Sequence, residues 1–111
     1  MKITTSSIRI AGHHNDCLVI SISDTLTGND TNSLREEVSN SIKTDYEVIY
    51  LDAKGVTETD LSGINEVIHS FYTLQNASKK LIFAFKRGSE IEKWVNTTGL
   101  HKFIETAISP A

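Results

Sequence analysis

The chain has 111 residues, of which 39% are hydrophobic and 23% charged, and its formal net charge is −3. These values predict one globular domain over residues 1–111 and exclude both disorder and the basic surface typical of nucleic-acid binding. The longest apolar run, residues 81–85, is far shorter than the roughly 20 residues of a membrane-spanning helix. With no apolar signal segment at its start and a single cysteine, Cys17, the chain is expected in the cytoplasm.

The N-terminal part predicts a hairpin followed by a helix. Polarity alternates over residues 7–11, and residues 17–23 are rich in β-branched side chains, so both stretches are expected to be strands. The turn-like residues 12–16 between them predict an antiparallel hairpin. A polar loop over residues 24–30 then leads to a helix over about residues 31–43.

This first helix has several possible starts. Ser33 and Glu36 have the spacing of a capping box, while Asp30 or Thr31 can equally be the N-cap. Apolar residues recur at every fourth position and predict a thin buried stripe: Leu34, Val38 and Ile42.

The middle of the chain predicts a strand, a loop and a helix. Residues 48–52 begin with four consecutive apolar residues, which predicts a central strand covered on both faces. The polar residues 53–59 predict a loop, and the helix is expected to start near Asp60. One face of this helix is apolar and is expected to pack on the sheet: Leu61, Ile64, Val67, Ile68, Phe71 and Leu74. The opposite face is polar: Asn65, Glu66, His69 and Thr73.

The C-terminal part predicts a fourth strand, a third helix and a short tail. Residues 80–85 form the strand. Ser89 and Glu92 have capping-box spacing for the helix, and Gly99 is placed to end it in the left-handed conformation. The tail, residues 100–108, fits a strand or a helix, and the pattern slightly favours a helix.

This order of elements predicts an α/β fold. Strand–helix–strand crossovers are right-handed and build parallel pairs, and the opening hairpin adds one antiparallel strand. The expected architecture is a mixed, mostly parallel sheet of four to five strands, with the third strand central and helices flanking it.

The D-L-S-G junction at residues 60–63 is the candidate functional centre. N–H groups in the first turn of a helix lack intrahelical partners and carry partial positive charge, so a hydroxyl there is well placed to be phosphorylated or to anchor a partner. Asp60 is expected to cap the helix by accepting a bond from the N–H of Ser62 or Gly63. Ser62 is expected to face solvent, whereas Leu61 either covers the sheet edge or contacts a partner.

Gly63 requires a compensating contact. Glycine inside a helix costs about 1 kcal/mol relative to alanine, so another backbone is expected to approach it closely, either from this chain or from a partner. Gly63→Gln is therefore expected to weaken partner binding and to leave the isolated domain folded.

No pattern in the chain predicts catalysis, a cofactor or a metal site. The histidines are adjacent or isolated in sequence: His13 and His14, His69, and His101. Cys17 is expected to be an inert core thiol, Trp94 to lie in the core, and Asp52 to make structural hydrogen bonds. The chain contains no G-x-x-x-x-G-K-[ST], G-x-G-x-x-G or G-x-S-x-G motif, so no enzymatic activity is predicted.

Three stretches resemble the STAS domain family of anti-sigma factor antagonists. VIYLDAKGVTETDLSG resembles the family's apolar strand, loop and D-S-S-G or D-S/T-x-G motif, while LIFAF resembles its next strand and TTGLHKFI its helix-ending segment. The element order agrees over almost the whole chain. The resemblance implies a STAS-like α/β domain that binds another protein and is not an enzyme.

The resemblance also implies a partner and a form of control. The family docks through the surface around its motif, which Asp60, Ser62 and Gly63 match here. In phospho-regulated members the partner is a histidine-kinase-like ATPase of the anti-sigma or switch-kinase type, and phosphorylation of the motif hydroxyl releases it.

One position departs from that pattern. Leu61 occupies the place of the usual phosphoacceptor, and leucine cannot be phosphorylated. Either Ser62, Thr59 or Thr57 takes over that role, or the chain is not switched in this way.

The sequence thus predicts a docking site for an anti-sigma factor or a histidine-kinase-like ATPase, with Ser62 as the phosphorylation candidate. The predicted contact residues surround the start of the second helix: Thr57, Glu58, Thr59, Asp60, Leu61, Ser62, Gly63 and Asn65. The alternative is a constitutive STAS subunit of a membrane-associated ABC (lipid) transport complex, docked on the ABC transporter ATPase, or another signalling scaffold. Neither alternative involves nucleic acid or direct membrane insertion.

Overall fold

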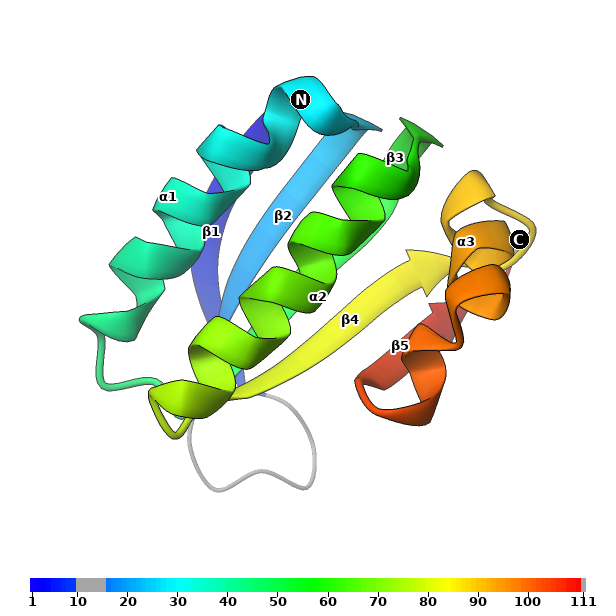
Figure 1. The fold of residues 1–111 in the computed structure, drawn as a ribbon. Coiled ribbons are helices and arrows are strands. Elements are labelled where there is room, and N and C mark those ends of the chain that lie inside the picture. The colour runs from blue at the N-terminus through cyan, green and yellow to red at the C-terminus, as the bar shows by residue number, and fades with distance from the viewer. Residues whose placement is uncertain (10–15, 111) are drawn as a thin grey trace.

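The computed structural model describes residues 1–9 and 16–110 and folds them into one sheet and three helices (Figure 1). The strands are β1 (Lys2–Arg9), β2 (Asp16–Leu26), β3 (Val48–Thr59), β4 (Lys80–Lys86) and β5 (Glu105–Ser109). The helices are α1 (Thr31–Ile42), α2 (Leu61–Asn76) and α3 (Glu90–Thr98), with short 3₁₀ turns η1 (Gly28–Asp30) and η2 (Leu100–Lys102).

The strands lie in the sheet in sequence order, β1-β2-β3-β4-β5. β1 pairs antiparallel with β2, and the other neighbours pair in parallel. These pairings confirm the predicted hairpin, the mixed and mostly parallel sheet, and the central place of β3. In the part of the chain that the structure describes, no helix is both long and apolar enough to span a membrane.

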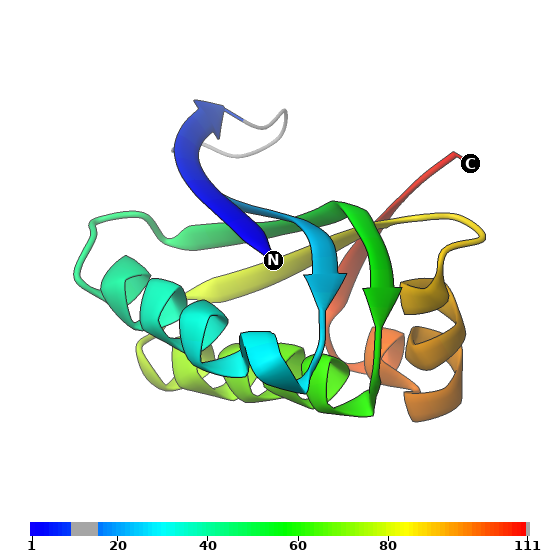
Figure 2. The same cartoon turned by 90° about the horizontal axis from the view of Figure 1, so that it is seen from above.

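All three helices cover the same face of the sheet (Figure 2). Burial along β3 therefore alternates, since Ile49 and Leu51 are buried while Tyr50 and Asp52 on the open face are half-buried. The prediction that this strand is covered on both faces was wrong. Successive right-handed crossovers that advance in one direction across a sheet leave every helix on one side. An unbroken buried run occurs instead in β4, at residues 81–85.

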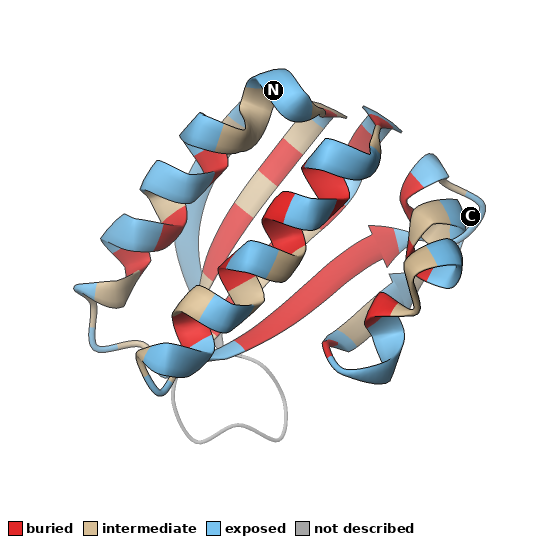
Figure 3. Cartoon of the chain, in the orientation of Figure 1, coloured by how far each residue is buried: buried red, intermediate tan, exposed pale blue. Residues whose placement is uncertain are grey.

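The hydrophobic core lies between that face and the helices (Figure 3). Its largest fully buried side chains come from the strands, the helices and η2: Ile20, Ile22, Leu26, Leu34, Ile49, Leu51, Ile64, Leu74, Phe83, Phe85, Ile91 and Leu100. The inward face of α2 is largely as predicted, although Ile68 and Phe71 are only partly buried. Leu61 does not belong to it, because its side chain is 45% exposed.

Glu66, which was predicted to face water, is buried. Arg35 of α1 explains this, because its Nε and Nη2 atoms donate to the two carboxylate oxygens of Glu66 at 3.1 and 2.7 Å. A bidentate ion pair of this kind satisfies the hydrogen-bonding capacity of a carboxylate that burial would otherwise destabilise. The pairing joins α1 to α2 and cannot be read from the periodicity of either helix alone.

The first two strands differ from the prediction in their bounds. β1 begins at Lys2, so the predicted strand over residues 7–11 overlaps only its end, and residues 10–15 of the predicted strand and turn lie outside the described residues. β2 continues to Leu26, into the predicted loop. Most of β1 is exposed at the sheet edge, so its polar residues give no alternation to detect.

The predicted loop over residues 53–59 is the second half of β3. It pairs with β2 as far as Leu26 opposite Thr59, through two register shifts at each of which β3 carries one extra residue. Such bulges interrupt the two-residue period of a strand. The polar sequence therefore resembles a loop although its backbone is extended and paired.

For the C-terminal tail, which fitted a strand or a helix, residues 105–109 form β5 rather than the slightly favoured helix. Gly99 does end α3 in the left-handed conformation, with φ of 70°. The predicted capping box of α3 forms in part. Ser89 Oγ accepts from the Glu92 N–H at 3.4 Å, but the Glu92 carboxylate accepts from the N–H of Gly88.

Candidate functional site

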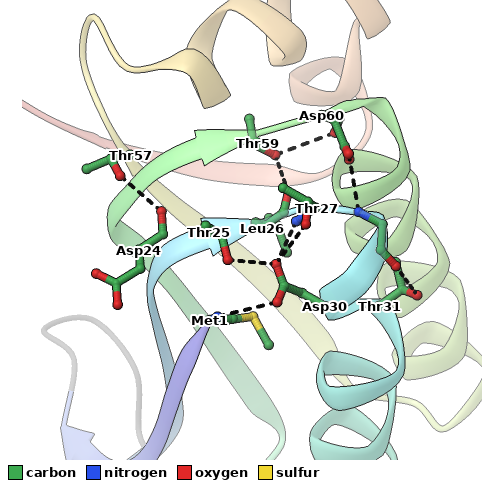
Figure 4. A network of polar contacts seen from close by, with 11 residues as sticks. Met1, Asp24, Thr25, Leu26, Thr27, Asp30, Thr31, Thr57, Thr59 and Asp60 are labelled. Atoms are coloured by element: carbon green, nitrogen blue, oxygen red, sulfur yellow. Dashed lines mark hydrogen bonds and ion pairs between the residues drawn. The ribbon is translucent and has the colours of Figure 1, made fainter.

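The D-L-S-G junction lies where β3 ends and α2 begins, beside the segment that follows β2 (Figure 4). Asp60 is the N-cap of α2, as predicted. Its Oδ1 accepts from the Gly63 N–H at 2.8 Å, and its Oδ2 accepts from the Gly28 N–H at 3.3 Å. One carboxylate therefore both caps the helix and ties it to the η1 turn.

Thr59 is buried, and two of its polar groups are engaged. Its hydroxyl donates to the carbonyl of Leu26 at 2.7 Å, and its N–H donates to the Glu90 carboxylate at 3.0 Å. The hydroxyl of Thr57 is exposed and donates to the carbonyl of Asp24 at 3.0 Å. Of the two threonines weighed as phosphoacceptors, Thr59 thus has its hydroxyl held inside the protein.

Leu26 also supplies the backbone that compensates for Gly63. A Cβ added to Gly63 would fall 2.6 Å from the carbonyl carbon of Leu26. Of the two sources considered, this chain rather than a partner therefore provides the close approach. Gly63 is itself buried, so a partner would contact its exposed neighbours, such as Leu61 and Ser62, rather than Gly63.

The remaining predicted contact residues form one accessible surface. Leu61, Ser62 and Asn65 on α2 are exposed, as are Thr57 and Glu58 at the end of β3, and Asp60 is partly exposed. We call these six residues the docking surface. The exposure of Leu61 rules out the first of its two alternatives, that the side chain covers the sheet edge.

A second carboxylate, Asp30, holds the η1 turn, whereas the sequence suggested it only as a possible N-cap of the first helix. Asp30 Oδ2 accepts from the Thr27 N–H at 2.8 Å and from the Thr25 hydroxyl at 2.9 Å, and the Met1 ammonium lies 3.4 Å from Oδ1 (Figure 4). Burial alone would raise the pKa of Asp30, but these donors and the positive charge outweigh it and lower the pKa below its usual range. The spacing of Thr27 and Asp30, three residues apart, is the sequence signal that could have revealed this turn.

Trp94 combines a core contact with a place at the surface. It is partly buried and packs against the core, and it also lines a hollow of about 460 Å³ together with Thr59, Glu90, Lys93 and Thr97. None of the six residues of the docking surface lines this hollow, but Thr59, which does, immediately precedes Asp60 in the chain.

Cys17 and Asp52, the other residues considered from the sequence, are buried or hydrogen-bonded within the chain. Cys17 is fully buried, and burial together with the charge of Asp16 raises the pKa of its thiol. Asp52 accepts from the Lys54 N–H at 3.0 Å. Within residues 1–9 and 16–110, no group of three His, Cys, Asp or Glu side chains could hold a metal ion. His13 and His14 lie outside the described residues.

Comparison with known proteins shows which families and solved structures share this fold. A family model described as the STAS domain matches residues 9–110, and a search of curated proteins finds no match. An anti-sigma factor antagonist from Mycobacterium paratuberculosis superposes with a TM-score of 0.73 at 15% identity, over 95% of this chain and 85% of that one. The unphosphorylated anti-sigma factor antagonist SpoIIAA gives 0.69 at 16% identity, over 94% and 88%. The phosphorylated Bacillus cell fate determinant SpoIIAA gives 0.62 at 17%, over 94% and 91%. These similarities confirm the predicted STAS-like fold.

Proposed function

Because the chain belongs to the STAS domain family, we propose that it acts in the cytoplasm by binding a regulatory protein through the docking surface. A domain of this family is generally a non-enzymatic interaction module, and its structural neighbours include anti-sigma factor antagonists. The proposed partner is an anti-sigma factor or a histidine-kinase-like ATPase.

The observation that carries this proposal is the exposure of Leu61. An exposed leucine on the first turn of a helix gives an apolar anchor, and the surrounding polar residues give it a rim, which is the usual anatomy of an interface. The anchor is held in place because Asp60 fixes the turn to η1 and Gly63 packs on Leu26. Little conformational entropy would therefore be lost there on binding.

Ser62 is the proposed point of control. Its side chain is exposed next to Leu61, and no described residue forms a hydrogen bond with its hydroxyl. A phosphate there would add roughly −1.5 to −2 charges beside the carboxylate of Asp60. The helix N-terminus tolerates that charge, but a partner packed on Leu61 would have to desolvate it.

The alternative is permanent docking on the ATPase of an ABC (lipid) transport complex. The observation that favours it is Leu61 itself, because an apolar residue at the usual acceptor position suits a contact that is never released. Both alternatives use the docking surface, so the identity of the partner separates them.

The test captures partners from the native lysate with the immobilised full chain and compares two variants. Leu61→Asp removes the proposed anchor. Tyr72→Asp is the matched control, because Tyr72 is another exposed apolar residue on α2, about 16 Å farther along the helix axis. Mass spectrometry identifies what each protein retains, and circular dichroism establishes that both variants are folded.

A small ATPase or anti-sigma factor that is retained by wild type and Tyr72→Asp but lost from Leu61→Asp supports the first proposal. Transport ATPase and permease components with the same dependence support the alternative. A partner that is retained equally by Leu61→Asp overturns the assignment of the docking surface.

A further inference from the structure

The sheet divides between β3 and β4. These strands pair only from Val48 opposite Lys80 to Asp52 opposite Ala84. β3 continues to Thr59 alongside β2, whereas β4 stays with β5 up to Lys86. Beyond Asp52, β3 therefore has a strand partner on one edge only among the described residues.

The two bulges account for this division. Both lie beyond Asp52 and both place the extra residue on β3. A bulge bends the strand that carries it and increases its twist. β3 consequently follows β2 while β4 keeps its own direction, and a groove opens between them.

The β3–β4 groove has a cavity volume of about 640 Å³. Residues 54–57 of β3 form one wall, and residues 86–90, from the end of β4 to the start of α3, form the other. At its far end the Glu90 carboxylate accepts from the Thr59 N–H at 3.0 Å. A carboxylate thus already occupies one hydrogen-bond position on the strand edge that faces the groove.

The groove is positively charged although the whole chain carries a net charge of −3. Lys54, Lys86 and Arg87 line it, and Glu90 is its acidic lining residue. Lys54 pairs with Asp52 at 3.7 Å. Lys86 and Arg87 are exposed and have no ion-pair partner within the described residues.

Of the two glycines that line the groove, Gly88 leaves open space in front of its backbone. A Cβ added to Gly88 would meet no atom within 4 Å, and one added to Gly55 would contact Ser23. Gly55 and Gly88 both line the groove and both are exposed. The absence of a side chain at Gly88 leaves room for another main chain opposite the free edge of β3.

We propose that the β3–β4 groove binds an extended acidic segment of another protein, which pairs with the free edge of β3. Main-chain hydrogen bonds to an exposed strand edge give affinity in this mode of recognition, and the side chains give selectivity. Here the carboxylates of the segment would contact Lys86 and Arg87. A strand-like ligand matches a groove that follows residues 54–57 of β3 better than a compact anion does. The groove adjoins the docking surface at Thr57, but the proposal does not rest on the function proposed for that surface.

Fluorescence polarisation tests the proposal with the full chain and a labelled octapeptide of alternating Glu and Val. We expect saturable binding, and at least tenfold weaker binding of an alternating Lys-Val peptide. Lys86→Glu/Arg87→Glu should also weaken binding of the Glu-Val peptide at least tenfold. The matched control, Lys43→Glu/Lys102→Glu, has the same net charge but changes two exposed lysines outside the groove, and it should change the affinity less than threefold.

A second peptide separates strand pairing from simple charge attraction. N-methylation at alternate residues leaves its charges in place but removes hydrogen-bond donors from one edge, so we expect at least tenfold weaker binding. Equal affinity for the methylated peptide, or an equal loss in both double variants, would overturn the proposal. Displacement of the peptide by equimolar inorganic phosphate or ATP would instead make the groove a small-anion site. Leu61→Asp should bind the peptide normally, so failure here and failure of the docking surface are distinguishable.

Discussion

The backbone of Leu26 packs directly against Gly63. A Cβ added to Gly63 would lie only 2.6 Å from the carbonyl carbon of Leu26. The contact brings the end of β2 against the first turn of α2, while Asp60 joins the same turn to Gly28. The first contact joins two backbone segments, and the second is made by the short side chain of the capping Asp60. The frame of the docking surface is therefore set by close main-chain packing and has little room to adjust.

Gly63→Ala is expected to destabilise the protein by about 1–3 kcal/mol, because the added methyl group must displace backbone rather than a flexible side chain. The change is measured as the free energy of unfolding in urea. Gly28→Ala is the matched control, since its Cβ would contact Ser62 at 3.4 Å, an ordinary distance. We expect the control to change stability by less than about 0.5 kcal/mol. Equal stability of Gly63→Ala and wild type would contradict the close approach.

This packing corrects the expectation for Gly63→Gln. The sequence predicted a variant that binds its partner poorly but folds normally. Because Leu26 supplies it, the larger side chain disturbs the domain itself. Leu61 and Ser62, which are exposed, are the appropriate positions for testing binding.

Leu74→Ala should cost more stability than Phe71→Ala. Leu74 is fully buried, and the loss for a buried leucine is about 2–5 kcal/mol. Phe71 is partly buried and packs edge-on against Phe103, with ring centroids 5.7 Å apart, so we expect about 2 kcal/mol from burial and ring contact. Urea unfolding of both variants gives the comparison, and a larger loss for Phe71→Ala would show that the inward face of α2 is assigned wrongly.

How far the fold could be predicted depended on whether burial left a pattern in the sequence. α2 and β4 were predicted well because each buries a continuous face. The end of β3 was missed because two bulges break its alternation. The tail was left between strand and helix because β5, an edge strand of five residues, is too short and too exposed to show an alternating pattern.

The site divides in the same way. Asp60 could be identified because an N-cap is a local feature of sequence. The roles of Leu26 and Glu90 could not, because each contacts Thr59 from a distant part of the chain. Only the topology of the sheet brings these residues together.

Asp30→Asn is expected to lower the free energy of unfolding by about 1–2 kcal/mol at pH 7, because the charged acceptor of the Thr25 and Thr27 bonds is lost. The lowered pKa of Asp30 fixes the pH dependence. A carboxyl with a lower pKa in the folded state stabilises fully above its unfolded pKa, about 3.9, and loses that contribution as pH falls through the folded pKa.

Urea unfolding at pH 7 and at pH 3 or below should therefore show the difference between wild type and Asp30→Asn shrinking in acid. Asp45→Asn, at an exposed residue between α1 and β3, should show no comparable difference at either pH. A difference for Asp30→Asn that grows in acid would have the wrong sign for this network.

Ser62 provides the sharpest test of the proposed switch. Ser62→Ala should bind the partner as tightly as wild type and gain no phosphate after incubation with cognate lysate and ATP. Ser62→Asp should bind more weakly, because its carboxylate adds charge beside Asp60 where the partner would exclude water. Each 1.4 kcal/mol of that cost lowers the affinity about tenfold, and a phosphate, with its greater charge, should weaken binding further.

Under permanent docking, Leu61→Ser would weaken binding and lysate treatment would leave wild type unchanged. Intact-mass spectrometry of wild type, Ser62→Ala and Leu61→Ser, followed by titration with the captured partner, distinguishes these outcomes. A stable complex that gains no phosphate on wild type would remove the switch and leave the docking surface in place.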